Sequence, residues 1–261
     1  MGVLFYNGFG EKQETSKVKS SRPTPRVILC AGVKSSGSTW LFNVVIAILK
    51  ERRKRGVMAF YADGLAMMPP GTERARFLVI KSHEPSGALL YLSRLTRGVL
   101  FVTLREPRDV IASLLQRFGH SFEGALIEAE RQAARTVELL DHEKPLVFQY
   151  ESGFTEKSAS IDRIAKALGI RLSAAARERI QRSLTRDAVK RKIERLKKKG
   201  NFGARPNADS FDPGTQWHPG HVGDGSIGKY KKTLTAAQQK RVLAATRDYR
   251  KRFGYLPTRK R

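Results

Sequence analysis

The sequence predicts a three-layer α/β fold, in which a central, mostly parallel sheet of four to five strands is flanked by helices. Largely apolar runs without polar alternation occupy residues 27–31, 77–80 and 99–104, and another begins the segment 146–151. Such runs are expected for strands that are buried on both faces of a sheet. Apolar residues at helical spacing follow the first, third and fourth of these runs. The 261 residues suffice for one such domain, and nothing indicates a second hydrophobic core.

The chain is expected to form a single domain over 26–256 with a short extension on each side. Residues 1–25 are polar and end in two prolines, which predicts a flexible lead-in. Residues 172–200 are rich in Lys and Arg and predict a basic, exposed helical region. Residues 201–228 are rich in Gly, Pro, Asn and Asp and long for an ordinary connection, which predicts a lid-like loop. Residues 257–261 are a basic tail.

The overall charge limits the partners of the protein. Lysines and arginines number 50 against 24 acidic residues, a formal net charge of +26, so the partners are expected to be anionic. The single cysteine, Cys30, predicts neither a disulfide framework nor a Cys/His metal site. No apolar run approaches the length of a membrane span. We therefore expect a soluble, cytoplasmic protein that contacts membranes only peripherally, through its charge.

A Gly/Ser turn connects the first predicted strand to the first predicted helix. It runs from Gly32 to Gly37, and the helical spacing of apolar residues begins just after it. Backbone N–H groups, the positive end of the helix dipole and four hydroxyl groups converge here, from Ser35, Ser36, Ser38 and Thr39. This arrangement favours phosphate binding, although the same turn also serves as a plain tight connection in many α/β proteins.

The spacing of the two glycines fits the Walker A template, which makes the predicted fold P-loop-like. However, Ser38 stands where that template requires lysine, so the γ-phosphate of a nucleoside triphosphate is a poor candidate ligand. Trp40 follows directly and offers an aromatic face on which a nucleotide base can stack.

The segment 36–41, Ser-Gly-Ser-Thr-Trp-Leu, resembles the 5′-phosphosulfate loop of the sulfotransferase family. That loop usually reads Pro-Lys/Arg-Ser-Gly-Ser/Thr-Thr-Trp. The family's basic residue falls at Ser35 here, and a lysine stands one place earlier, at Lys34. The resemblance implies that residues 34–40 bind the 5′ end of 3′-phosphoadenosine 5′-phosphosulfate (PAPS). It also implies that either Lys34 or another residue supplies the loop charge.

The second apolar run ends in Lys-Ser-His-Glu-Pro, residues 81–85. Ligands bind at the carboxyl edge of open α/β sheets, where this segment is expected to lie. His83 has three features of a catalytic residue: a position at the end of a strand, a nearby lysine and a turn fixed by proline. A lone histidine is more often structural. The segment resembles the Lys-Thr-His stretch of cytosolic sulfotransferases, which implies that His83 is the catalytic base and that Lys81 assists charge on the sulfuryl group.

The third run leads into Arg-Glu-Pro-Arg-Asp-Val-Ile-Ala-Ser, which resembles the family's 3′-phosphate motif, Arg-Asn-Pro-Arg/Lys-Asp-Val-x-x-Ser. Glu106 is the only change among the typed positions. The resemblance implies that Arg105 and Ser113 bind the 3′-phosphate, consistent with the planar donor fork of arginine. The fourth run resembles the family's strand ending in Tyr-Glu-Asp, which implies that Tyr150 lies near the adenine, although Ser152 replaces the aspartate.

Residues 218–224, His-Pro-Gly-His-Val-Gly-Asp, resemble the family's Arg-Lys-Gly-x-Val-Gly-Asp-Trp segment, which closes over the 3′-phosphate. His218 and Pro219 replace the basic pair, and no tryptophan follows the aspartate. The candidate ligands in this region are therefore the N–H of Gly220 and the side chain of Lys229.

The leading functional hypothesis is the transfer of a sulfuryl group from PAPS to a hydroxyl or amine, with 3′-phosphoadenosine 5′-phosphate (PAP) as product and no metal. One alternative is a P-loop phosphotransferase, which would need magnesium and for which Glu84 is the nearest strand-end acid. The other is a nucleic-acid-binding protein, favoured by charge but lacking a recognisable motif.

The acceptor pocket is expected to be built from residues 61–71, 116–124 and the 201–228 loop. A small molecule, a glycan or a glycolipid would fit the leading hypothesis, and the basic surface weakly favours an anionic or membrane-associated acceptor. The sequence does not decide the oligomeric state.

Overall fold

The structure is a computed structural model that describes residues 24–52, 56–142, 144–202 and 210–255. The predicted basic tail lies outside the described residues, as does all of the predicted lead-in except its last two residues. Within the described ranges, no helix combines the length and the apolar character needed to cross a membrane.

The centre of the fold is a five-stranded parallel sheet with the order β2-β3-β1-β4-β5. Its strands are β1 (Arg26–Gly32), β2 (Val57–Tyr61), β3 (Phe77–Ser82), β4 (Val99–Leu104) and β5 (Leu146–Gln149). The α/β prediction is therefore confirmed. The edge strand β2 was absent from the predicted strands, although its five residues, Val-Met-Ala-Phe-Tyr, form an uninterrupted apolar run.

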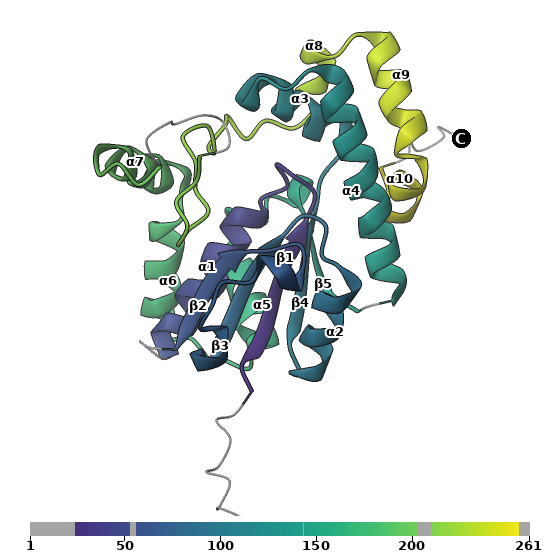
Figure 1. Cartoon of the computed structure of the whole chain (residues 1–261). Coiled ribbons are helices and arrows are strands. Elements are labelled where there is room, and N and C mark those ends of the chain that lie inside the picture. Colours follow the sequence, from purple (N-terminus) through teal and green to yellow (C-terminus); the bar gives the residue numbers. More distant parts are fainter. Residues whose placement is uncertain (1–23, 53–55, 143, 203–209, 256–261) are drawn as a thin grey trace, which may run out of the picture.

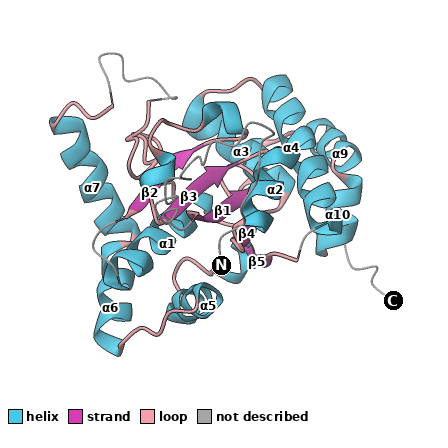
Figure 2. Ribbon diagram, turned by 60° about the horizontal axis from the view of Figure 1, so that its bottom comes forward, coloured by secondary structure: helices cyan, strands magenta, loops and turns pink. Residues whose placement is uncertain are grey.

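Helices cover both faces of the sheet and complete the three layers (Figures 1 and 2). One face carries α1 (Ser38–Arg52), α5 (Ser158–Leu168), α6 (Ala174–Ser183) and α7 (Arg186–Lys198). The other carries α2 (Gly87–Leu95), α3 (Pro107–Phe118), α4 (Phe122–His142), α9 (Ala236–Ala245) and α10 (Arg247–Phe253). The single-turn α8 (Tyr230–Thr233) lies beside α3, and three short 3₁₀ turns span Leu65–Met67, Thr72–Arg74 and Tyr150–Ser152.

The central strand β1 divides the core in two. Ile28 and Cys30 belong to the cluster around α1 and α5, whereas Val27, Leu29 and Ala31 belong to the cluster around α2, α3 and α4. All five side chains are at most 1% exposed. The prediction that β1 is buried on both faces is therefore confirmed. A strand with helices on both faces needs apolar side chains on both, which explains its uninterrupted apolar run.

Two helical regions are each divided into two helices. Gly119, with φ of 66°, caps the C-terminus of α3 before α4 begins, at the point where Phe-Gly-His interrupts the helical pattern of 116–140 in the sequence. Thr246 separates α9 from α10. Reciprocal capping between Thr235 and Gln238 begins α9.

Gly98, just before β4, is a sensitive point of the core. A Cβ atom there would lie 2.0 Å from the carbonyl oxygen of Val27 and 2.5 Å from the Oγ of Ser93. We expect Gly98→Ala to lower the free energy of unfolding in urea by about 2–4 kcal/mol, because backbone must move. Gly87→Ala is the matched control, since a Cβ atom added there would meet nothing within 4 Å. Equal unfolding free energies for the two variants would contradict this account.

Candidate functional site

A cavity of about 690 Å³ opens at the carboxyl edge of β1, β3 and β4, between the sheet and the segment that precedes α8. Most of the residues predicted from the sequence line it: Lys34, Ser35, Gly37, Ser38, Thr39, Trp40, Lys81, His83, Arg105, Tyr150 and Lys229. Ser36, Ser113 and Gly220 are not part of its wall. The turn after β1 and the arginine after β4 therefore face one shared space.

The turn between β1 and α1 has the backbone of an anion-binding loop. Ser35 and Gly37 have positive φ values of 59° and 88°, and residues of this conformation occur in the nests of successive backbone N–H groups that bind anions. The Oγ of Ser35 is buried and has no hydrogen-bond partner among the described residues. The hydroxyl of Ser36 is instead turned to the sheet, 2.5 Å from the carbonyl oxygen of Val33 and 2.6 Å from the Oγ1 of Thr103.

His83 and Lys81 lie together at the end of β3. The Nδ1 of His83 is 2.6 Å from the carbonyl oxygen of Gly32, and its Nε2 is 2.9 Å from the Nζ of Lys81. A carbonyl can only accept, so we assign the proton to Nδ1, which leaves the lone pair of Nε2 toward the lysine. Burial, then the charge of Lys81, lowers the pKa of His83 well below 6.5. Burial, then the charge of Lys34, lowers the pKa of Lys81 to about 7.

Asp63 holds this turn in place and was missed by the sequence analysis. Its Oδ1 accepts hydrogen bonds from the Oγ of Ser82 at 2.5 Å and from the backbone N–H groups of His83 and Glu84 at 2.9 and 3.0 Å. Its Oδ2 accepts from the hydroxyl of Tyr61 at 2.5 Å. Asp63 lies two residues beyond β2, so recognising that edge strand would have placed it at the same sheet edge.

We expect Asp63→Ala to lower the free energy of unfolding by about 2–4 kcal/mol, because it leaves four donors without their acceptor. Burial raises the pKa of Asp63, but the hydrogen bonds outweigh it and hold the pKa below 3.8. The stabilisation is therefore present above about pH 4 and is lost as pH falls through the depressed pKa. Urea unfolding at several pH values checks this. Asp162→Ala, which removes an exposed ion pair with Arg177, should change little.

Arg105 connects the two sides of the cavity. Its guanidinium donates to the carbonyl oxygen of Ser35 at 2.8 Å and to that of Ser226 at 3.1 Å, and it lies 4.0 Å from the centre of the Tyr150 ring. The hydroxyl of Tyr249 bonds both its backbone N–H and its carbonyl oxygen, each at 3.1 Å. The Nε of Arg105 is buried and unpartnered within the described chain.

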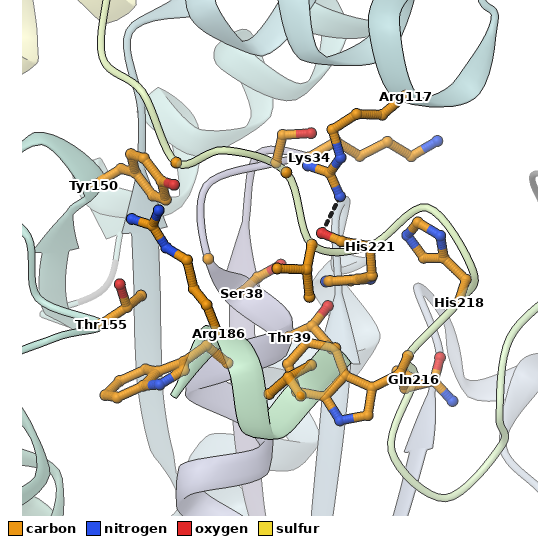
Figure 3. Close-up of a pocket in the computed structure, with 18 of the residues that line it drawn as sticks. Lys34, Ser38, Thr39, Arg117, Tyr150, Thr155, Arg186, Gln216, His218 and His221 are labelled. Atoms are coloured by element: carbon orange, nitrogen blue, oxygen red, sulfur yellow. Dashed lines mark hydrogen bonds between the residues drawn. The ribbon is translucent and has the colours of Figure 1, made fainter. Parts of the chain in front are cut away.

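Ser113 and Arg117 lie one turn apart on α3. The Oγ of Ser113 is fully buried and finds no partner among the residues described. Arg117 donates from Nε to the carbonyl oxygen of Gly220 at 2.9 Å and from Nη2 to that of His221, the bond drawn in Figure 3. Burial, then the charge of Arg105, lowers the pKa of Arg117 to about 10. Gly220 thus packs on the end of α3 rather than facing the cavity.

Residues 210–229, which we call the lid segment, are fastened at several further points. The Nη1 of Arg186 donates to the carbonyl oxygen of Asp224, and Asp109 accepts from the N–H groups of Gly228 and Tyr230 at 2.7 and 3.1 Å. At its other end, the side chain of Asn43 donates to the carbonyl oxygen of Thr215 at 2.8 Å. Apart from the N–H of Tyr230, the first residue of α8, the groups held are main-chain groups of the segment.

Lys229 is the last residue of the lid segment, and its side chain, only 9% exposed, lines the cavity. Its Nζ is 3.6 Å from the carboxylate of Asp224. Burial, then the charge of Arg105, lowers the pKa of Lys229. In Figure 3, Tyr150 and Arg186 lie at one side of the cavity and His218 at the other.

The unpartnered polar atoms around the cavity indicate the kind of ligand it suits. Within the described ranges, no group of three or more His, Cys, Asp or Glu side chains is placed to hold a metal ion. Nine buried polar atoms are without partners in the described structure, and seven of them belong to residues that line the cavity: Ser35, Trp40, Arg105, Gln181, Trp217, His218 and His221. The hydroxyl of Ser35, the guanidinium of Arg105 and the two indoles can donate hydrogen bonds, whereas the Oε1 of Gln181 can only accept. Donors therefore outnumber fixed acceptors, which suits a ligand rich in acceptor oxygens.

The fold is that of the sulfotransferases. No protein-family model matches the sequence, and no curated protein matches it either. The structure is similar to mouse sulfotransferase SULT7A1 complexed with PAP, with a TM-score of 0.63 and 14% identity over 90% of this chain and 86% of that one. It is also similar to retinol dehydratase in complex with retinol and PAP, with a TM-score of 0.58 and 16% identity over 88% and 83% of the two chains. The same protein in complex with androsterone and PAP gives a TM-score of 0.58 and 17% identity over 88% and 82%.

Proposed function

We propose that this protein is an enzyme that transfers a sulfuryl group from PAPS to a hydroxyl or amine of an acceptor. The observation that carries the proposal is the position of Arg105, whose guanidinium links the turn after β1 to the lid segment across one cavity. Two anion-binding elements that share a cavity suit a ligand with anionic groups at both ends of a nucleoside. The sulfotransferase fold supports the same conclusion.

The residues fit such a donor. Buried donors at Ser35 and at the Nε of Arg105 line the cavity and lack acceptors in the described chain, and phosphate oxygens would supply them. In the proposal, residues 34–39 hold the 5′ end, and Arg105 holds the 3′-phosphate with the side chain of Lys229 nearby. Ser113 and the N–H of Gly220 do not line the cavity in this structure, so in the proposal they reach the 3′-phosphate only after the lid segment shifts. Trp40 and Tyr150 flank the adenine.

PAPS supplies an activated sulfuryl group and leaves as PAP, so the protein has to position the acceptor and manage charge and one proton. His83 is the proposed base, because it lines the cavity, its Nε2 carries the lone pair beside Lys81, and its depressed pKa keeps it neutral. Lys81, 2.9 Å from that nitrogen, is placed to stabilise negative charge that develops beside it, and Lys34 is the second candidate for this role.

For the acceptor we propose a small molecule, a glycan or a glycolipid. Side chains of Tyr61, Phe118 and His120 from the expected acceptor regions line the cavity, as do Trp217 and His218 from the lid segment. The exposed cations of α7, whose first residues also line the cavity, would attract an anionic acceptor or an anionic membrane surface. A cytoplasmic location belongs to the same proposal.

Titration calorimetry tests the donor site. We expect PAP to bind without magnesium and more tightly than adenosine 5′-phosphate, which lacks the 3′-phosphate, by about 10²- to 10³-fold. Arg105→Met should remove most of that difference, because PAP loses its 3′-phosphate contact, while adenosine 5′-phosphate loses only the support that the guanidinium gives the turn at Ser35. ATP binding that is tighter than PAP binding and requires magnesium would support a phosphotransferase instead.

A further inference from the structure

Glu128 on α4 places a carboxylate beside the turn that would bind the anionic end of the donor. Its Oε1 lies 2.5 Å from the Nζ of Lys34, and its Oε2 lies 3.7 Å from the Nδ1 of His120. The side chain of Glu128 is only 14% exposed, so solvent screens its charge weakly. A shielded carboxylate next to an anion site opposes ligand binding, which points to a role exercised through its lysine partner.

The backbone of Lys34 is fixed to α4 by a hydrogen bond, whereas its side chain contacts α4 through the ammonium group. Its N–H donates to the Oε1 of Gln132 at 2.8 Å, and the Nε2 of Gln132 donates to the Oε1 of Glu128 at 3.1 Å. Glu128 and Gln132 are four residues apart and so lie on one face of the helix. The side chain of Lys34 is 35% exposed and lines the cavity, so its ammonium can exchange partners by rotation of the stem alone.

The local charges favour such an exchange. Ser35 occupies the position where the resemblance places a basic loop residue, so Lys34 is the cation within the turn itself. The guanidinium groups of Arg105 and Arg117 already donate to carbonyl oxygens of the turn and the lid segment. A phosphate or phosphosulfate group bound against residues 35–39 would offer the ammonium an anion that rivals the carboxylate.

We propose that Glu128 competes with the donor for Lys34: it holds the ammonium in the donor-free protein, releases it when the 5′ end binds, and recaptures it as PAP leaves. This inference rests on the proposed function. Under this proposal, Glu128 lowers the affinity for PAP by withholding Lys34 from it. Removing the carboxylate should therefore raise PAP affinity substantially only when Lys34 is present.

A double-mutant cycle on the full-length chain tests the competition, with PAP as the titrant in calorimetry. We expect Glu128→Gln to tighten PAP binding about tenfold in the parent, but at most about threefold in the Lys34→Met background, where only direct repulsion is relieved. Glu130→Gln is the matched control, because it removes the same charge from an exposed position of α4 and should change affinity less than twofold.

Equal tightening in both backgrounds would reduce Glu128 to simple repulsion and overturn the proposal. Unchanged or weaker PAP binding by Glu128→Gln would also overturn it, since the carboxylate would then be positioning the lysine for use. Glu128→Asp, which keeps the charge on a shorter side chain, should tighten binding by an intermediate factor and replaces Glu128→Gln should that variant not fold. Failure of the parent to bind PAP would instead count against the proposed function.

Discussion

His83→Ala is expected to lower the rate of sulfuryl transfer by about 10²- to 10⁴-fold, the usual contribution of a general base. The Nε2 of His83 carries the lone pair because its Nδ1 is committed to the carbonyl oxygen of Gly32 at 2.6 Å. The depressed pKa keeps that lone pair available at neutral pH. Single-turnover measurement of the transfer step, with saturating PAPS and acceptor, gives the relevant rate.

The control for this variant is its affinity for PAP, which reports whether the donor site is intact. PAP affinity should stay within about threefold of the parent, because His83 touches neither the turn hydroxyls nor Arg105 in the described hydrogen bonds. A variant that binds PAP and transfers sulfate as fast as the parent would remove His83 from the mechanism. Loss of both PAP binding and transfer would show a structural effect, which the unfolding transition would confirm.

Lys81 is expected to produce a narrow pH optimum. The profile of kcat/KM reports the free enzyme, in which the pKa of Lys81 is about 7 and that of His83 lies well below 6.5. Activity should therefore rise as His83 loses its proton and fall above about pH 7 as Lys81 becomes neutral. Lys81→Arg should abolish the alkaline limb, because a guanidinium stays protonated there. An alkaline limb that persists unchanged in this variant would assign it to another group.

The same lysine is expected to lower stability. Because the pKa of Lys81 is lowered on folding, burial of its charge opposes folding fully below about pH 7, and this effect fades as pH rises toward 10.5. Lys81→Met should therefore raise the free energy of unfolding at pH 6 by a few kcal/mol, since each pKa unit corresponds to about 1.4 kcal/mol. The gain at pH 9 should be smaller. Urea unfolding at the two pH values measures the difference. A gain independent of pH would indicate better packing rather than relief of a buried charge.

The central part of the fold could be predicted because its signals are local. Four strands are apparent in the sequence as apolar runs, and the turn after β1 is apparent from its glycines and hydroxyls in one short segment. The edge strand β2, Val-Met-Ala-Phe-Tyr, is equally apolar but was not assigned to the sheet, so the role of Asp63 was missed with it. An apolar run can identify a strand, but the groups that meet at its end depend on pairing with distant segments.

Side-chain direction at the site could not be predicted, because it depends on contacts between distant segments. The hydroxyl of Ser36 turns away from the cavity toward Thr103, which is 67 residues further along the chain. Arg117 and Arg186 belong to amphipathic helices, where an arginine usually indicates a solvated face, and only the folded lid segment gives them carbonyl partners. Such roles need the tertiary structure.

The way the lid segment is attached bears on how this protein can change. Arg105, Arg117, Arg186 and Asp109 grip backbone carbonyl and N–H groups, which every amino acid other than proline provides alike. Substitutions at His218 or His221 would therefore change side chains that line the cavity and leave these backbone hydrogen bonds in place. Under the proposed function, the acceptor pocket could thus diverge among related chains without loss of the contacts that attach the segment.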